Sequence, residues 1–374
     1  MKEKILRSIL MMLLVLAGFS IWTLRSEAEP PALARLKGAE KERVSKLIEG
    51  AKKEGELVAY ASILRPDVQA DLNPMFMEEY GLSESNFKIK MTSMRTEAIV
   101  AKITEELRAK VYKTDVVQDT AFDWFNELMA RGELMPYESP EYKRFCPISV
   151  NPEIGQGNPP YFIAGTFSTY TLFYNPKYVK GDIISWKDIL RPEHKGKIAC
   201  GDVTKSFSYT AAYLAFRKVL PADFFRTLAK QEPFLLVSAS DFVNKAIPGE
   251  YPIAALTSPG PAFRANLEGA GLKIVFPTEG VAAVGRQTAI LSRAPHPNAA
   301  KLFIDFFHAD AAQKIIMNKE GYPTGRLGLK SQYPESIVPI YDVKGAIQMD
   351  WRKVTDKERN EAREEFRRIM IEKK

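Results

Sequence analysis

The sequence predicts an α/β protein with two lobes, each built on a mostly parallel sheet flanked by helices, and joined by crossing strands. Three observations predict this class. Short apolar strands alternate with amphipathic helices at intervals of about 10–15 residues, which is typical of parallel sheets. A Pro-rich stretch at 136–160 interrupts this alternation and indicates a boundary. The apolar run Phe162–Tyr174 follows and is long enough to cross between two lobes, after which a second α/β unit begins.

Length and composition exclude several classes of protein. The chain has 374 residues, of which 45% are hydrophobic, so it is neither disordered nor fibrous. Its 53 Lys and Arg residues alternate with 46 Asp and Glu residues, a pattern that does not suit nucleic acid. Two cysteines and three histidines form neither a disulfide scaffold nor a zinc motif. The sequence contains no phosphate-loop or dinucleotide motif, so we expect no cofactor.

The first 28 residues have the pattern of a cleavable export signal. Basic side chains precede the apolar run Ile9–Ile21, and the small residues Ser26 and Ala28 follow it. We therefore expect cleavage after Ala28 and a periplasmic location. An uncleaved membrane anchor stays open as the alternative, because the apolar stretch is close to the roughly 17 residues that span a bilayer.

In an oxidising compartment Cys146 and Cys200 could pair. However, Cys200 lies in a strand-like apolar run and Cys146 in a loop, so we favour two free thiols.

The first lobe begins with a helix at 40–54. Its apolar residues Val44, Leu47, Ile48 and Ala51 recur at helical spacing, and Gly55 ends the helix. The following elements, in chain order, are a strand at 56–61, a helix at 66–80, a strand at 87–91, a helix at 98–110, a strand at 115–117 and a helix at 124–131.

The second unit continues the same alternation. We expect a short segment at 186–190, a strand at 197–200, a polar loop at 201–208, a helix at 209–219, and strands at 252–256 and 272–276. From Val281 the chain resumes strand character, and the helix 298–317 and a charged helix at 354–374 follow. The expected organisation is a signal peptide at 1–28, lobe 1 at 40–165 and 279–345, lobe 2 at 166–278, and a helical tail at 346–374.

Hydroxyl and cationic side chains follow the expected strands, where ligands bind in open α/β sheets. Such groups, together with helix N-termini, stabilise anions. The candidate ligand-binding residues are Ser62, Arg65, Ser93, Arg95, Thr120, Thr169, Tyr170, Lys205, Ser206, Ser208, Ser258 and Tyr322. The alternatives are structural: the serines as helix caps, the arginines as solvated or paired charges, and the tyrosines as core residues.

Three segments carry a resemblance to a known family. They are Lys53–Val58, Ser185–Ile198 and Ala294–Phe306, the last followed by Gln313. In these segments the chain resembles the extracellular solute-binding family 1 proteins of ABC importers, in the cluster that includes ferric-iron-binding members. The resemblance implies a type 2 periplasmic binding protein fold with the ligand held between two lobes. It also implies a monomer that is no enzyme and delivers a small molecule to an inner-membrane permease.

The residues expected at an iron site are missing. Relatives that bind ferric iron use two adjacent tyrosines from the second lobe and a histidine or carboxylate from the first. Here the corresponding segment reads Thr257-Ser258-Pro259-Gly260-Pro261, and the first-lobe segment Ser62-Ile63-Leu64-Arg65 has no histidine. We therefore expect no metal site and an organic anion as ligand, with ferric iron as the alternative.

A secreted hydrolase is the less favoured alternative from another class. The sequence contains no nucleophile elbow, and Asp119 and Glu279 are the one attractive pair of acids. Neither the identity of the ligand nor the choice between an importer and a sensory role follows from the sequence.

Overall fold

The computed structural model describes residues 29–153, 156–333, 337, 339–343, 345–347, 349–350 and 353–373. The predicted signal peptide at 1–28 lies outside these ranges. Within them, no helix has the length and apolar character needed to cross a membrane.

One sheet path runs through the whole molecule. Its strands are β1 (Glu56–Ala61), β2 (Lys88–Ser93), β3 (Val116–Asp119), β4 (Phe162–Tyr174), β5 (Ile198–Gly201), β6 (Phe234–Leu236), β7 (Ile253–Thr257), β8 (Lys273–Val275), β9 (Val281–Ile290) and β10 (Ala346–Ile347). The strand order is β2-β1-β3-β9-β4-β7-β5-β6, with β10 beside β9 and β8 beside β4. The strands β1, β2 and β3 are parallel, as are β5, β6 and β7, so each lobe has a parallel core.

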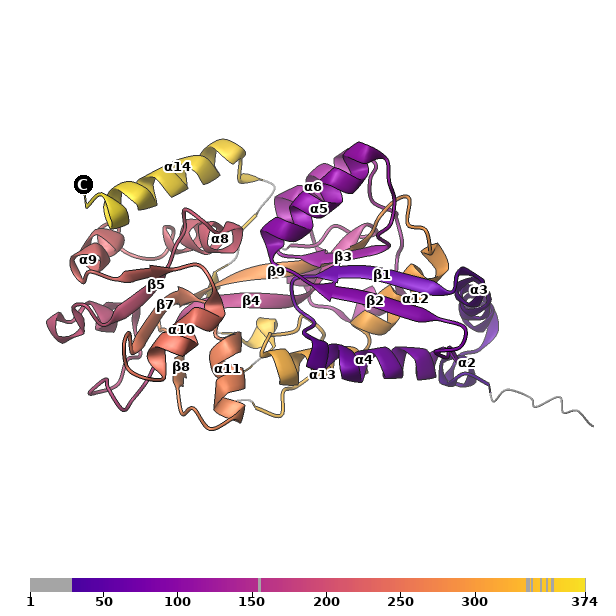
Figure 1. The fold of residues 1–374 in the computed structure, drawn as a ribbon, viewed down its shortest axis with the longest axis horizontal. Coiled ribbons are helices and arrows are strands. Elements are labelled where there is room, and N and C mark those ends of the chain that lie inside the picture. Colours follow the sequence, from indigo (N-terminus) through magenta and orange to yellow (C-terminus); the bar gives the residue numbers. More distant parts are fainter. Residues whose placement is uncertain are drawn as a thin grey trace, which may run out of the picture.

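Helices cover both faces of each half of this sheet (Figure 1). In the first lobe they are α2 (Pro31–Arg35), α3 (Gly38–Glu54), α4 (Pro66–Glu79), α5 (Thr96–Ala109), α6 (Phe122–Ala130), α7 (Pro147–Val150), α12 (Pro297–His308) and α13 (Asp310–Glu320). In the second they are α8 (Phe207–Phe216), α9 (Phe224–Lys230), α10 (Ala239–Ala246) and α11 (Gly260–Leu267). The tail helix α14 (Asp356–Phe366) packs against α8.

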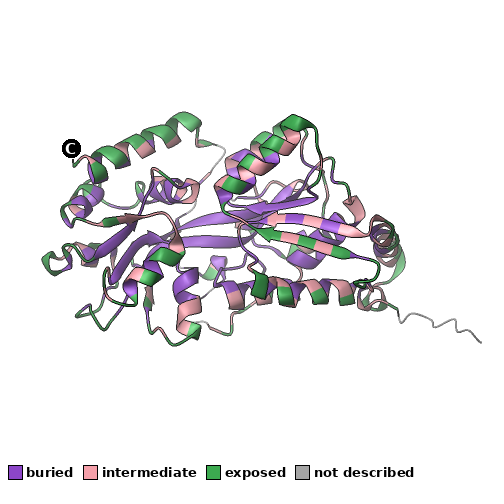
Figure 2. Cartoon of the chain, viewed as in Figure 1, coloured by how far each residue is buried: buried purple, intermediate pink, exposed green. Residues whose placement is uncertain are grey.

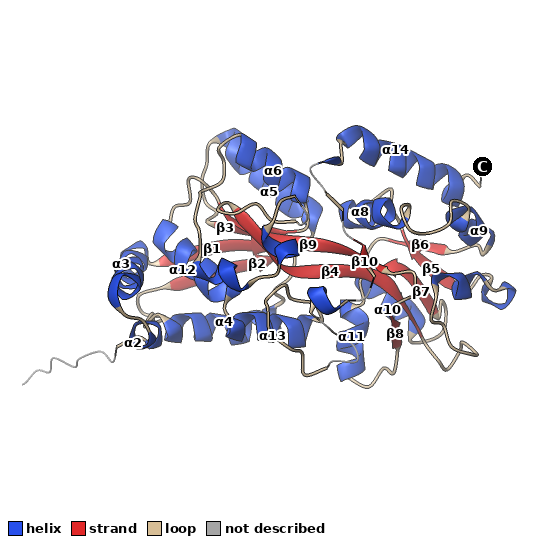
Figure 3. Cartoon of the chain, turned by 180° about the vertical axis from the view of Figure 1, so that it is seen from behind, coloured by secondary structure: helices blue, strands red, loops and turns tan. Residues whose placement is uncertain are grey.

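Two long antiparallel strands join the lobes. The strands β4 and β9 pair from Phe162↔Ala289 to Tyr170↔Ala282 and run through the middle of the molecule (Figure 3). Every residue of both strands is buried, whereas the edge strand β2 is largely exposed (Figure 2). Because both faces of β4 and β9 are covered, a polar side chain on either strand must point into the protein or into a cavity.

Much of the expected element pattern is confirmed. The strands β1 and β4 have the expected bounds, and α3 ends at Gly55, whose φ of 72° is left-handed. The tail is helical from Asp356 and continues into a π-helical turn at Arg367–Ile371. Both Cys146 and Cys200 are buried free thiols, as expected.

The single helix expected over 298–317 is wrong. The chain is extended at Ala309, with φ −73° and ψ 159°, so α12 and α13 are separate helices. The side chain of Gln313 donates to the carbonyl of Phe307 at 2.8 Å and satisfies part of the interrupted turn. Apolar residues continue at helical spacing across the break, so the periodicity does not reveal it.

The elements between 220 and 250 have no counterpart in the sequence prediction. The strand β6 has three residues and α9 has seven, which is too short for a clear periodic pattern. The omission matters because β6 leads into α10, and this junction lies at the cleft.

Candidate functional site: an interlobe cleft

A cavity of about 260 Å³ lies between the lobes at the carboxyl ends of their parallel strands. The first lobe lines it after β1 and β3 and at the start of α5, and the second lobe lines it after β6 and β7 and at the starts of α8, α10 and α11. The side chains of most use to a polar ligand are those of Ser62, Arg95, Thr96, Glu97, Thr120, Tyr170, Ser206, Ser208, Ser238, Ser240, Ser258, Arg264, Arg286 and Tyr322.

Four helices begin at this cavity. Residues at the starts or in the first turns of α5, α8, α10 and α11 line it, so the positive dipole ends of these helices lie at the cavity. In α8 the hydroxyl of Ser206 accepts a hydrogen bond from the N–H of Tyr209 at 3.4 Å. The starts of α5, α10 and α11 have no side-chain cap. The unsatisfied donors at these starts are suited to an anion.

The most deeply placed cation of the cavity is Arg286 on β9, which is 7% exposed. Its Nη1 donates to the hydroxyl of Ser62 at 2.6 Å, and its Nη2 donates to Ser168 at 2.6 Å. The guanidinium carbon lies 4.5 Å from the ring centre of Tyr322. These contacts fix the guanidinium between strand β4, the end of β1 and the ring of Tyr322.

Within the described part of the chain, no carboxylate forms an ion pair with Arg286, and its buried Nε has no hydrogen-bond partner. The nearest compensation is electrostatic, from the fully buried Asp119. The Oδ1 of Asp119 accepts from the N–H groups of Thr120 and Ala121, at 2.6 and 3.1 Å. Burial raises the pKa of Asp119 to about 6, and Arg286 opposes that rise. A buried cation without a partner is costly, so the site is electrostatically incomplete.

The other two arginines of the cavity are already paired. Arg264 on α11 donates to Glu320 of α13, at 3.2 Å to the carboxylate and 3.1 Å to the carbonyl. Arg95 has a side chain that is 65% exposed and lies 3.5 Å from the carboxylate of Glu97. Neither therefore offers as much uncompensated charge as Arg286.

Eight of the twelve predicted site residues line the cavity together. They are Ser62, Arg95, Thr120, Tyr170, Ser206, Ser208, Ser258 and Tyr322. The hydroxyl of Ser258 is buried and has no hydrogen-bond partner among the described residues. Ser206 caps the start of α8 and also lines the cavity. A helix cap and a ligand contact are the two interpretations that the sequence left open for this serine, and its position is compatible with both.

The other four predicted residues lie elsewhere, each for a physical reason. Arg65 is held by Glu320, with 3.3 Å from its Nε to the carboxylate, and by Asp67 at 2.8 Å. Ser93 is exposed at the end of the edge strand β2. Thr169 follows the alternation of β4 to the face opposite Tyr170. Lys205 has a side chain that is 69% exposed and lies 3.6 Å from Asp202.

The sequence prediction missed Arg286, Arg264, Ser238 and Ser240. A usable signal existed for Arg286, because it interrupts the apolar strand character that the sequence shows from Val281, in the segment that forms the buried strand β9. A charge in such a run has to be compensated or functional. No comparable signal marked Ser238 and Ser240, since the short strand before them was not predicted.

The acid pair considered for a hydrolase does not form. Glu279 accepts from the N–H of Trp186 at 3.3 Å and from the hydroxyl of Ser185, and it does not line the cavity. Asp119 is fully buried beneath the cavity wall. The described residues also contain no cluster of three or more His, Cys, Asp or Glu side chains that could hold a metal ion.

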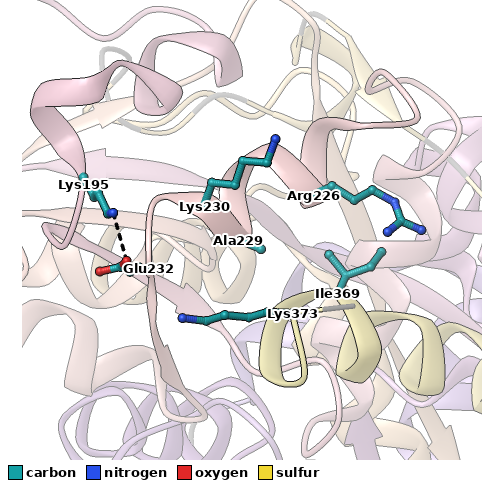
Figure 4. A pocket seen from close by; sticks show the side chains of 7 residues that line it. All are labelled: Lys195, Arg226, Ala229, Lys230, Glu232, Ile369 and Lys373. Carbon is teal, nitrogen blue, oxygen red and sulfur yellow. Dashed lines mark ion pairs between the residues drawn. The ribbon is translucent and has the colours of Figure 1, made fainter.

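Two other hollows lack the features of this site. One lies between α9 and the end of the tail, where Lys195 pairs with Glu232 at 3.0 Å and the charged ends of Lys230, Arg226 and Lys373 point in different directions (Figure 4). The other lies in the first lobe, where the charges are paired, as in the 2.8 Å contact of Arg43 with Asp305. Neither lies at the carboxyl ends of parallel strands.

A two-lobed α/β fold with crossing strands and a polar cleft between its lobes defines the type 2 periplasmic binding proteins. Residues 123–338 match the family model described as bacterial extracellular solute-binding protein, and the chain belongs to this family. The resemblance noted in the sequence is thereby confirmed at family level. No curated protein matches the sequence significantly.

Solved structures show the same fold at low sequence identity. The periplasmic binding protein AfuA from Actinobacillus pleuropneumoniae, with exogenous fructose-6-phosphate bound, is 21% identical, with a TM-score of 0.68 over 84% of this chain and 98% of that chain. Iron-bound HitA from Pseudomonas aeruginosa is 18% identical, with a TM-score of 0.66 over 84% and 99%. An ABC transporter substrate-binding protein from Agrobacterium tumefaciens is 14% identical, with a TM-score of 0.68 over 86% and 96%.

Proposed function

We propose that this protein captures a small organic anion in the interlobe cleft and delivers it to an inner-membrane ABC permease from the periplasm. The observation that carries the proposal is Arg286, a buried cation at the cleft without a carboxylate partner among the described residues. An anionic group at this position would supply the missing partner. The buried Nε of Arg286, which has no hydrogen-bond partner among the described residues, adds to this unmet demand.

The surroundings of Arg286 support the same ligand charge. Helix N-termini carry about half a positive charge each, and four of them meet at the cavity. The arginines Arg95 and Arg264 are offset by Glu97 and Glu320, and Arg286 is offset through space by Asp119, so the helix ends supply the remaining positive potential. Serine and threonine hydroxyls complete the wall and can bind hydroxyl or ester oxygens.

A phosphorylated or carboxylated small molecule with further hydroxyl groups suits this wall. The fructose-6-phosphate in AfuA belongs to that chemical class, although at 21% identity the likeness extends to the fold alone. Ferric iron is the second candidate because HitA was solved with iron bound. The tyrosines that line this cleft do not favour it, because Tyr170, Tyr209 and Tyr322 come from three separate segments and form no pair of phenols adjacent in the sequence.

A thermal-shift screen of the exported chain (29–374) tests the proposal. The panel should contain matched pairs, each an anion and its neutral parent, such as a hexose phosphate and the hexose, with ferric citrate as a separate arm. A ligand at 100 times its Kd stabilises the folded protein by about 2.7 kcal/mol. We expect stabilisation by one or more anions and none by their neutral parents. Stabilisation by neutral solutes alone, or a coloured ferric complex, would contradict the proposal.

A further inference from the structure

The tail helix α14 is built into the second lobe. Its residues Ala362 and Phe366 are fully buried, and the ring of Phe366 packs edge-on against Tyr213 of α8 at 5.4 Å. Nearby, Arg363 donates to the hydroxyl of Thr210 at 3.1 Å and lies over the ring of Phe207 at 5.2 Å. Because these contacts are buried and numerous, α14 moves with the second lobe.

One side chain of α14 reaches the first lobe. The guanidinium of Arg359 forms an ion pair with Asp123, in the first turn of α6, at 2.8 Å. The two side chains are 11% and 23% exposed, so water screens the pair less than it screens a surface pair. Asp356 and the carbonyl of Val354 contact the same guanidinium and orient it. The N-terminal end of α14 faces α5 and α6 across the gap between the lobes (Figure 1).

This ion pair closes a seam next to the ligand cleft. A small cavity there is lined from the first lobe by Thr120, Phe122 and Asp123, from the second by Phe207, Ala211 and Leu214, from β9 by Val284, and from the tail by Arg359. Thr120 lines both this seam and the cleft. The seam and the cleft are therefore adjacent and share a wall.

We propose that Arg359 is a positioning residue that clasps α14 to Asp123, holds the two lobes at the spacing required for ligand capture and thereby raises ligand affinity. The lobes are joined by the long strands β4 and β9, which can flex as a hinge. Rotation about these strands would separate α14 from α6 and break the clasp. An ion pair made in one arrangement of the lobes shifts the population toward that arrangement. The effect on affinity rests on the proposed function, whereas the effect on lobe spacing needs no ligand.

The experiment measures the distance between the lobes in the ligand-free protein. Spin labels are attached to cysteines introduced at the exposed positions Ser85 in the first lobe and Lys180 in the second, since both native cysteines are buried. Pulsed electron paramagnetic resonance then gives the distance distribution between the two labels. The distribution of the protein with both Asp123 and Arg359 is compared with those of Asp123→Asn and Arg359→Gln. We expect one narrow distance distribution with the clasp intact, and a broader or displaced one in both variants.

Matched variants separate the clasp from general damage to the tail. Arg367→Gln removes an arginine that pairs with Glu364 and Glu372 within the tail, and it should leave the distribution unchanged. Arg359→Lys retains the charge and should restore much of the narrow distribution. In titration with the anion found by screening, the Kd of Asp123→Asn should be at least about threefold higher than that of the parent. A change of this size corresponds to the free energy that one partly exposed ion pair contributes. The proposal is overturned if Asp123→Asn and Arg359→Gln superimpose on the parent, or if the parent is already as broad as they are.

Discussion

At the scale of single residues, the central feature is a cation buried where the chain supplies no ion-pair partner among its described residues. Arg286 is held by two serine hydroxyls and the face of Tyr322, which orient the guanidinium but do not neutralise it. Asp119 offsets this charge only through space and without an ion pair, so the buried cation destabilises the empty protein and becomes favourable when an anion binds. This arrangement links the stability of the protein to the presence of its ligand.

Replacing Arg286 tests this link. Arg286→Met keeps an unbranched apolar stem and removes the guanidinium with its charge. Loss of one partner from a desolvated charged contact costs about 2–5 kcal/mol, so anion affinity should fall by at least about tenfold in calorimetric titration. The melting temperature of the empty protein should change little, because the lost hydrogen bonds are offset by relief of the buried charge. The control is Arg95→Gln. Because the side chain of Arg95 is exposed and paired, its loss should lower anion affinity by less than about threefold. Equal losses in the two variants would show that Arg286 has no special role.

Asp119 gives a pH-dependent prediction. Burial raises its pKa from 3.8 to about 6, so the folded protein binds this proton more tightly than the unfolded chain does. The contribution of Asp119 to folding is therefore most favourable at low pH and is lost as the pH rises through about 4 to 6. Asn carries no charge and can still accept from Thr120 and Ala121.

The free energy of unfolding of Asp119→Asn should therefore equal that of the parent protein near pH 4 and exceed it above pH 7. The gain should be about 1–3 kcal/mol, the upper value corresponding to the full pKa shift. Urea unfolding at both pH values measures the difference. Glu49→Gln, at an exposed position on α3, should show no such pH-dependent gain. A variant that is less stable than the parent at pH 7 would contradict the assigned environment of Asp119.

At the scale of elements, the site is assembled by helix starts rather than by a sequence motif. The starts of α5, α8, α10 and α11 lie at the carboxyl ends of the strands that precede them, because each helix follows its strand after a short turn. Three of these starts have no side-chain cap, which leaves their donors for a ligand.

The start of α10 can be tested with one substitution. Ala239 is the first residue of this helix, and Ser238 before it is extended, with φ −97° and ψ 127°. Proline is tolerated at the first helical position and after an extended residue, so Ala239→Pro should fold while it removes one N–H from the cleft. We expect anion affinity to fall by about three- to tenfold, since a net hydrogen bond contributes about 0.5–1.5 kcal/mol. Ala239→Ser keeps the N–H and should bind like the parent; equal binding by the proline variant would rule out a role for this donor.

Element patterns in the sequence were informative where strands and helices were long. The expected bounds of β1 and β4 hold, and eight of the twelve predicted residues share one cavity, because strand ends can be located from hydrophobic runs. The sequence did not reveal which charged side chains pair with each other and are therefore unavailable to a ligand. Arg65 was a reasonable ligand candidate until the structure placed Glu320, 255 residues away, against its side chain. Contacts at such separation, like the short β6 that precedes Ser238, depend on tertiary packing that local patterns do not encode.

At the scale of the whole molecule, the crossing strands explain how two half-sites become one. Arg286 on β9 and Tyr170 on β4 lie where the lobes meet, and each lobe adds hydroxyls and helix starts from its own strand ends. Neither lobe alone presents the full set of donors. Ligand affinity should therefore depend on the spacing of the lobes as well as on the cleft residues, and the ion pair of Arg359 with Asp123 provides a contact outside the cleft that controls this spacing.

The most direct test of anion binding is a crystal structure of residues 29–374 with the anion identified by screening. We expect the charged group of the ligand to lie between the lobes, within hydrogen-bond distance of the Arg286 guanidinium, and to accept from N–H groups at the starts of α8, α10 or α11. A ligand whose charged group points away from Arg286 into solvent, or a metal ion coordinated by the cleft tyrosines, would contradict this expectation.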